Sequence, residues 1–133
     1  AARAAAAARA VLLVDDSAFF RDMLTPVLKA SGYRVHTAAN VDDALRILTQ
    51  GTSIDAVITD VEMPDKDGFQ LVEAMRADGR WSALPVIALA SGVNPDAIQR
   101  ARKLRIAEFV AKFDRSGLLS ALAETQSPVV EAA

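Results

Sequence analysis

Short runs of aliphatic residues alternate along the chain with longer stretches whose apolar residues recur every three or four positions. The short runs are continuously apolar, which is typical of parallel strands buried on both faces. The longer stretches have the periodicity of amphipathic helices. The predicted strands span 11–14, 33–38, 56–59, 86–89 and 108–111, and the predicted helices span about 17–32, 40–48, 68–77, 95–104 and 114–122.

Polar residues mark where several of these helices begin. Ser17, Asn40 and Asp114 are residue types whose side chains accept hydrogen bonds from the first free amides of a helix. Asn94 precedes Pro95, and proline fits the first helical position because it has no amide to leave unpaired. Five strand and helix pairs therefore predict an α/β fold, a doubly wound five-stranded parallel sheet with helices on both faces.

The folded part of the chain is predicted to be one domain spanning 11–125. Residues 1–10 are eight alanines and two arginines, and we expect a tether there because so short a segment does not hold a helix alone. Residues 126–133 are expected to be a fraying tail. A chain of 133 residues is long enough for one core and too short for an additional output or kinase module.

Charged and hydroxyl residues follow the carboxyl ends of four predicted strands. Each alone has a structural explanation as a helix cap, a turn residue or a solvated charge. Because doubly wound sheets place their binding sites at these strand ends, the set together predicts one functional site. Its members are Asp15 and Asp16 after the first strand, Asp60 after the third, Ser91 and Gly92 after the fourth, and Lys112 after the fifth.

Three carboxylates at one edge of a sheet repel one another unless they hold a proton or bind a cation. The expected donors are all oxygen, which favours Mg²⁺, with Mn²⁺ as the other option. One carboxylate could then act as a nucleophile on phosphorus. Lys112 and the Ser91 hydroxyl would stabilise charge on the transferred group, and Gly92 would leave room for it. The set therefore favours phosphoryl chemistry.

Composition excludes several classes of function. Fifteen Lys and Arg against 17 Asp and Glu give a formal net charge of −2, so no nucleic-acid partner is predicted. The absence of Cys excludes thiolate catalysis and Cys-ligated metal sites, and leaves the cytoplasm as the expected compartment. No apolar run approaches the roughly 20 residues that cross a bilayer, so membrane insertion is not expected.

Other enzyme classes fit the residues poorly. A hydrolase with an Asp nucleophile would normally carry a second Asp two residues later, whereas Glu62 follows Asp60 at that spacing. A serine triad would have only His36 available and lacks the G-x-S-x-G elbow around Ser91. Neither common nucleotide-binding loop occurs.

Four segments carry a resemblance to a known family. They are VLLVDDS at 11–17, VITDVEMPDKDG at 57–68, PVIALASG at 85–92 and FVAK at 109–112. Together they resemble the response regulator receiver domain of two-component signalling, over nearly the whole predicted domain. The resemblance implies a flavodoxin-like sheet with the strand order 2-1-3-4-5.

The resemblance also implies the chemistry of the acidic residues. Asp60 would be the phosphoacceptor, taking its phosphoryl group from the phosphohistidine of a histidine kinase or from the kinase's phosphotransfer domain. Mg²⁺ would be bound by the carboxylates of Asp15, Asp16 and Asp60 and by the backbone carbonyl of Glu62. The isolated domain would be no enzyme for a separate substrate, although it would catalyse its own phosphorylation and dephosphorylation.

A switch is implied in the same way. Ser91 and Lys112 would contact the phosphoryl group, Gly92 would give it access, and Phe109 would be the aromatic whose rotamer reports phosphorylation. An ordinary aromatic residue on a strand is the alternative for Phe109. A downstream protein would bind the face formed by the fourth helix, fifth strand and fifth helix. A phosphate sink, or a receiver-like interaction domain that is never phosphorylated, is the alternative function.

The chain departs from the family pattern in places. Phe113 follows Lys112 where the family usually has a proline in a cis bond, which makes a cis bond less expected here. Arg105 stands where a glycine often ends the fourth helix. The basic stretch 100–105 is either a partner-facing patch or a solvated helix face. Residues 112–119 and 17–21 resemble receivers fused to chemotaxis-type histidine kinases, so a longer parent could be such a kinase.

Overall fold

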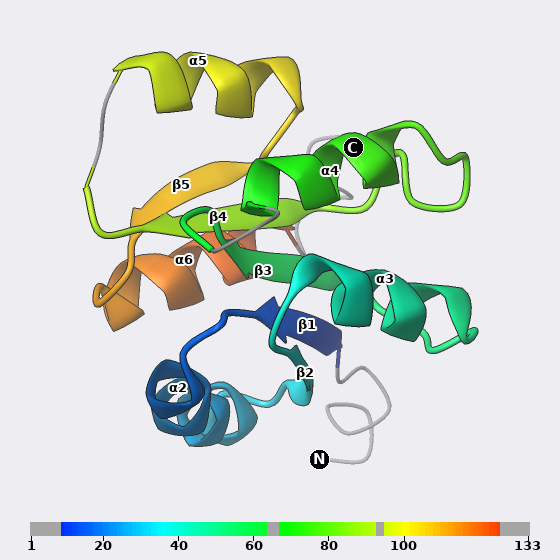
Figure 1. The fold of residues 1–133 in the computed structure, drawn as a ribbon. Helices are drawn as coiled ribbons and strands as arrows, with labels where there is room; N and C mark the ends of the chain where they lie inside the picture. The colour runs from blue at the N-terminus through cyan, green and yellow to red at the C-terminus, as the bar shows by residue number, and fades with distance from the viewer. Residues whose placement is uncertain (1–8, 64–66, 93–94, 126–133) are drawn as a thin grey trace, which may run out of the picture.

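The computed structural model describes residues 9–63, 67–92 and 95–125, and this part of the chain forms a parallel sheet with helices on both faces (Figure 1). The strands are β1 (Ala10–Val14), β2 (Arg34–Ala38), β3 (Ala56–Asp60), β4 (Val86–Ala90) and β5 (Glu108–Ala111). The helices are α2 (Ala18–Ala30), α3 (Val41–Thr49), α4 (Gly68–Arg76), α5 (Pro95–Lys103) and α6 (Arg115–Thr125). Each predicted strand and helix is present.

The strand order is β2-β1-β3-β4-β5, which confirms the order implied by the resemblance. All neighbouring strands are parallel. Helices α3, α4 and α5 cover one face of the sheet, and α2 and α6 cover the other (Figure 1). No helix in the described ranges has the length and apolar character needed to cross a membrane.

The two faces of the sheet carry separate apolar cores. In β1, Val11 and Leu13 pack with residues of α2 and α6, whereas Leu12 and Val14 pack with residues of α3 and α4. All four side chains are fully buried. Burial on both faces is the physical reason for the continuous apolar run by which the strand was predicted.

The first strand begins one residue earlier than predicted. Ala10 pairs with Arg34 and is fully buried, so it belongs to the sheet and not to the predicted tether. Its amide donates to Asp55 Oδ2 (2.8 Å), and the Asp55 amide donates back to the Ala10 carbonyl (2.7 Å). A carboxylate 45 residues away therefore sets this boundary. Residues 1–8 of the predicted tether and the predicted tail at 126–133 lie outside the described residues.

The predicted helix caps at Ser17, Asn40 and Asp114 are confirmed. Their side chains accept from the amides of Phe20 (3.2 Å), Asp43 (2.7 Å) and Gly117 (2.9 Å), the third residue after each cap. The predicted cap Asn94 lies outside the described residues, and α5 begins at Pro95.

Arg105 takes the backbone conformation that a glycine would have provided. Its φ is +58°, and the amides of Arg105 and Ile106 donate to the carbonyls of Arg102 and Ala101 (both 3.0 Å), which closes the end of α5. Gly32 closes α2 with the same pattern at φ +97°. A side chain in this conformation costs roughly 1 kcal/mol or more. The peptide bond between Lys112 and Phe113 is trans, as expected.

The start of α4 lies directly against the end of β3. A Cβ atom at Gly68 would lie 2.3 Å from the backbone oxygen of Asp60, so glycine permits this approach. Asp67 caps the helix: the Gln70 amide donates to Asp67 Oδ1 (3.0 Å) and the Asp67 amide donates to Gln70 Oε1 (2.7 Å). This capping box was not predicted from the sequence. It holds the start of α4 beside Asp60.

Candidate functional site

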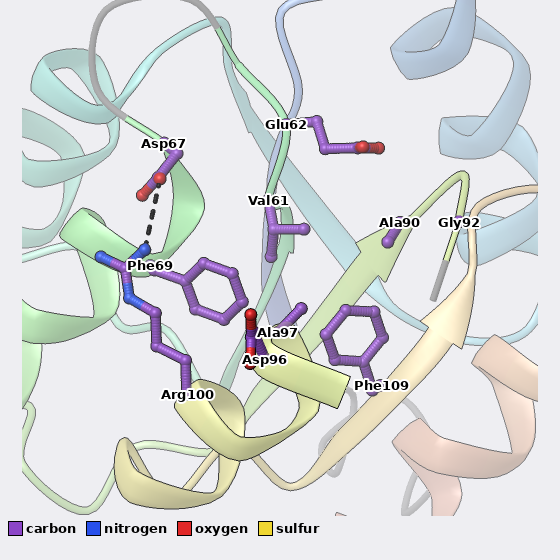
Figure 2. A pocket seen from close by; sticks show the side chains of 10 residues that line it. All are labelled: Val61, Glu62, Asp67, Phe69, Ala90, Gly92, Asp96, Ala97, Arg100 and Phe109. Atoms are coloured by element: carbon purple, nitrogen blue, oxygen red, sulfur yellow. Dashed lines mark ion pairs between the residues drawn. The ribbon is translucent and has the colours of Figure 1, made fainter. Parts of the chain in front are cut away.

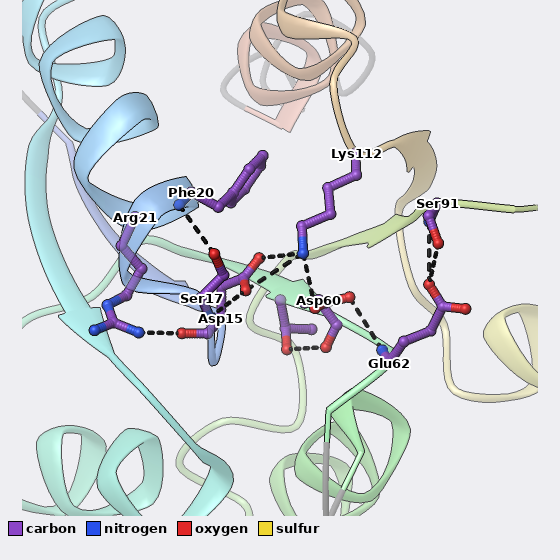
Figure 3. Close-up of polar contacts among 9 residues, drawn as sticks. Asp15, Ser17, Phe20, Arg21, Asp60, Glu62, Ser91 and Lys112 are labelled. Carbon is purple, nitrogen blue, oxygen red and sulfur yellow. Dashed lines mark hydrogen bonds and ion pairs between the residues drawn. The ribbon is translucent and has the colours of Figure 1, made fainter.

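Three strands deliver the central charged side chains to the same edge of the sheet. Asp60 is the last residue of β3, and Asp15 and Lys112 directly follow β1 and β5. The backbone hydrogen bonds between neighbouring strands continue through Asp15 and Lys112. The Asp15 amide donates to Ala38 O (3.0 Å), and the Lys112 amide donates to Ala90 O (2.9 Å). These bonds direct the side chains toward one another, as Figure 3 shows.

Lys112 joins the two buried carboxylates. Its Nζ lies 3.1 Å from Asp15 Oδ2 and 3.2 Å from Asp60 Oδ2. Burial acts to lower the pKa of Lys112, but the hydrogen bonds and charges of Asp15 and Asp60 outweigh it, so this pKa is raised. Burial raises the pKa of Asp60, and the charge of Asp15 adds to this, while Lys112 and the Glu62 amide oppose it. One lysine therefore faces two carboxyl groups.

The geometry fits a divalent cation. Asp15, Asp16 and Asp60 each offer an oxygen, and these three atoms lie within 4.8 Å of one another. Asp15 Oδ1 accepts from the Ser17 amide (2.9 Å), whereas the buried Oδ2 accepts no hydrogen bond from the residues that the structure describes and has Lys112 at ion-pair distance. A buried carboxylate oxygen that faces positive charge, in an all-oxygen set, suits Mg²⁺ or Mn²⁺.

The side chains of Glu62 and Ser91 are hydrogen-bonded to each other, beside the acidic cluster of Asp15, Asp16 and Asp60. The Glu62 amide donates to Asp60 Oδ1 (3.0 Å), but the Glu62 side chain reaches the end of β4, where Oε1 accepts from Ser91 Oγ (2.7 Å) and from the Ser91 amide (3.1 Å) (Figure 3). These bonds lower the pKa of Glu62. From the sequence, only the backbone carbonyl of Glu62 was predicted to have a role at the site. The contact of its side chain with Ser91 joins positions 29 residues apart, which no local sequence pattern links.

Phe109 and Gly92 line a cavity of about 250 Å³ beside the cluster. The Phe109 ring is half-buried and lies between β4 and α5, with Val61, Phe69 and Ala97 also on the lining (Figure 2). Apart from its chain neighbours, no described residue has a heavy atom within 4 Å of where a Cβ at Gly92 would lie, so Gly92 adds no bulk at the edge of this cavity.

Arg100 of the basic stretch faces α4. Its guanidinium lies 3.2 Å from Glu73 Oε2 and 3.6 Å from Asp67 Oδ2, and it stacks over the Phe69 ring at 4.6 Å (Figure 2). This residue therefore joins two helices and is not simply solvated. The basic stretch 100–105 in the sequence did not indicate this contact of Arg100 with α4.

Two exposed aromatic side chains lie close in sequence to residues of the site. Phe19 is 74% exposed at the start of α2, and Phe113 is 66% exposed directly after Lys112. The Phe113 ring packs edge-on against Phe20 with 5.6 Å between centroids, and Lys112 Nζ lies 4.9 Å from the centroid of Phe20. Phe113 thus packs beside the site in place of the expected family proline.

Comparisons with known proteins agree on one family. The family model described as "Response regulator receiver domain" matches residues 11–123. The two-component response regulator ORR3 of Oryza sativa is 31% identical over 102 residues, which cover 77% of this chain and 78% of that protein. The sensor histidine kinase CheAY of Helicobacter pylori is 32% identical over 103 residues, but these are only 13% of its length.

Solved structures show the same fold. The chemotaxis protein CheY4 of Vibrio cholerae superimposes with a TM-score of 0.83 at 32% identity, covering 90% of this chain and 99% of that one. The response regulator TrrA of Thermotoga maritima, solved in complex with Mg²⁺ and beryllofluoride, has a TM-score of 0.78 at 26% identity over 88% of this chain and 98% of its own.

Proposed function

This chain belongs to the response regulator receiver family of two-component signalling, and from that premise we propose that Asp60 is its phosphoacceptor. The observation that carries the proposal is the convergence of Asp15, Asp16, Asp60 and Lys112 on one edge of the sheet. The proposed donor is the phosphohistidine of a histidine kinase or its phosphotransfer domain. Mass spectrometry after incubation with Mg²⁺ and acetyl phosphate, a small phosphoryl donor, tests the assignment.

In the proposed reaction a carboxylate oxygen of Asp60 forms a bond to phosphorus. The bond between phosphorus and the donor nitrogen breaks, and its electron pair stays on the imidazole. Lys112 and the Ser91 hydroxyl bind phosphoryl oxygens, which places positive charge and a donor where negative charge develops. Mg²⁺ held by Asp15, Asp16, Asp60 and the Glu62 carbonyl would supply further positive charge there. By this proposal the domain catalyses its own phosphorylation and dephosphorylation.

Asp16→Ala is expected to weaken Mg²⁺ binding at least about tenfold, because the site loses one of its three charged ligands. Isothermal titration calorimetry with Mg²⁺ measures the affinity. Asp22→Ala, an exposed aspartate on α2, removes the same charge outside the cluster and should bind as the unmodified domain does. Unchanged affinity in Asp16→Ala would remove this residue from the metal site.

The proposed output is a change on the face formed by α5, β5 and α6. A phosphoryl group on Asp60 would draw the Ser91 hydroxyl inward, because charge-assisted hydrogen bonds are the stronger ones. Phe109 lines the cavity beside Ala90 and Gly92, so it can occupy the space that Ser91 leaves. The change is a shift between two populated states, and a downstream protein would bind the shifted face.

Amide NMR spectra with and without Mg²⁺ and beryllofluoride, a phosphoryl mimic, are expected to differ between residues 95 and 122 as well as in the loops around Asp15 and Asp60. In Ser91→Ala, which lacks the hydroxyl, the differences should be confined to those loops. Confinement to the loops in the unmodified domain would favour a phosphate sink over a signalling output.

We also propose that a longer parent of this domain is a chemotaxis-type histidine kinase. The support is the resemblance of residues 112–119 and 17–21 to receivers of such kinases, together with the similarity to a short part of CheAY. The proposed compartment is the cytoplasm, where a kinase of this class would present its phosphohistidine.

A further inference from the structure

Ser91 gives both of its hydrogen-bond donors to a single oxygen of Glu62. The Ser91 hydroxyl lies 2.7 Å and the Ser91 amide 3.1 Å from Glu62 Oε1. A carboxylate oxygen that accepts from a hydroxyl and an amide at the same residue makes the contacts that an oxygen of a phosphoryl group would make. The Glu62 side chain therefore presents an anionic acceptor to Ser91 before any phosphoryl group arrives.

Residue 62 spans the distance between the phosphoacceptor and Ser91. Its amide donates to Asp60 Oδ1 (3.0 Å), and its side chain extends away from Lys112 to the end of β4 (Figure 3). Both Glu62 and Ser91 are exposed, so the carboxylate stays there because of these hydrogen bonds and not because packing traps it.

A serine hydroxyl has one proton and can donate it to one strong acceptor at a time. If Ser91 donates to Glu62, it cannot donate to a phosphoryl oxygen on Asp60. The two acceptors therefore exclude each other at Ser91.

We propose that the Glu62 carboxylate is a latch that competes with the phosphoryl group for Ser91. The inference rests on the proposed phosphorylation of Asp60 and adds a positioning residue to it. By holding Ser91 at the end of β4, Glu62 stabilises the unphosphorylated conformation and weakens the binding of a phosphoryl group or its mimic. The Glu62 carboxylate acts through Ser91, whereas the backbone amide of the same residue donates to Asp60.

Plain charge repulsion between Glu62 and the phosphoryl group predicts an effect of the same sign. The two explanations differ in their dependence on Ser91. Repulsion persists when the Ser91 hydroxyl is removed, whereas in that background there is no hydroxyl for Glu62 to withhold from the phosphoryl group, although the amide contact remains. A double-mutant cycle therefore separates them.

The experiment measures the affinity for beryllofluoride at saturating Mg²⁺ by calorimetry. It compares the unmodified domain with Glu62→Ala, Ser91→Ala and the double variant. Glu62→Ala is expected to bind about tenfold more tightly than the unmodified domain, because a charge-assisted hydrogen bond no longer has to be broken. In the Ser91→Ala background the same change should have no effect. Glu124→Ala, an exposed glutamate on α6, is the control for loss of one negative charge.

Glu62→Gln keeps the size of the side chain and one acceptor oxygen, so it should show a smaller gain than Glu62→Ala. An equal gain in both Ser91 backgrounds would assign the effect to repulsion and overturn the latch. No gain in either glutamate variant would overturn it as well. Failure of the unmodified domain to bind beryllofluoride would instead contradict the phosphorylation of Asp60 itself, which is a different and recognisable result.

Discussion

Asp60→Asn is expected to abolish phosphoryl transfer to this domain. An asparagine amide has no anionic oxygen to attack phosphorus, and it removes one of the three carboxylates that favour a cation. After incubation with Mg²⁺ and acetyl phosphate, mass spectrometry should show one added phosphoryl group on the unmodified domain and none on Asp60→Asn. Asp22→Asn, the same change at an exposed position of α2, should be phosphorylated normally.

The variant should remain folded. Burial, with the charge of Asp15 added, raises the pKa of Asp60 above its ordinary value of 3.8 despite Lys112 and the Glu62 amide. A raised carboxyl pKa means that ionisation costs folding stability as the pH rises through that pKa. Without Mg²⁺ at neutral pH, Asp60→Asn should therefore be no less stable to urea than the unmodified domain. A labile phosphoryl group gained by a folded Asp60→Asn domain in the same yield would assign the phosphoacceptor elsewhere.

Arg76→Met is expected to destabilise the fold strongly. Arg76 ends α4, and its guanidinium donates to backbone carbonyls of two other segments, the loop before β4 and the end of α5. Burial lowers its pKa, and the nearby charge of Arg105 adds to this. The acceptors are the carbonyls of Leu104 (2.8 Å), Leu84 (2.8 Å), Trp81 (3.2 Å), Ser82 (3.2 Å) and Arg105 (3.2 Å).

Methionine keeps an unbranched apolar side chain and removes every hydrogen-bond donor. The measured decrease in the free energy of unfolding therefore reports the contribution of these hydrogen bonds. Partly buried carbonyls without donors cost on the order of 2 to 3 kcal/mol together, after allowance for those that water can reach. At a typical urea dependence for a domain of this size, the midpoint of unfolding should fall by roughly 1 to 2 M. Circular dichroism during urea titration measures it.

Arg80→Met is the matched control. Arg80 is exposed, and its guanidinium pairs with Asp78 (2.8 Å) and stacks over the Trp81 ring at 4.3 Å. An exposed pair adds little stability, so this variant should shift the midpoint far less than Arg76→Met. Arg76→Lys keeps the positive charge but not the planar set of donors. It should therefore recover little of the stability that Arg76→Met loses. Equal midpoints for Arg76→Met and Arg80→Met would show that the carbonyl contacts do not stabilise the fold.

The helices and strands and the central charged residues could be predicted from the order of residues alone. Strands buried on both faces must be continuously apolar, so β1, β3 and β4 were visible as runs, and the charged residues that end β1 and β3 were visible as interruptions. Because parallel strands end at one edge, placing Asp15, Asp60 and Lys112 together needed no side-chain geometry. The strand order, in contrast, came from the family resemblance and not from periodicity.

The hydrogen-bond partners of the remaining polar groups depend on how distant segments pack together. Ser91 donates to Glu62, and Arg76 donates to backbone carbonyls up to 29 residues away. The Asp55 carboxylate accepts from the first amide of β1. Periodicity reports which face of an element is buried and not where a flexible side chain finds an acceptor. The acceptor depends on which distant loops come together when both faces of the sheet pack. For this reason the contact between Glu62 and Ser91 could be seen only in the folded chain.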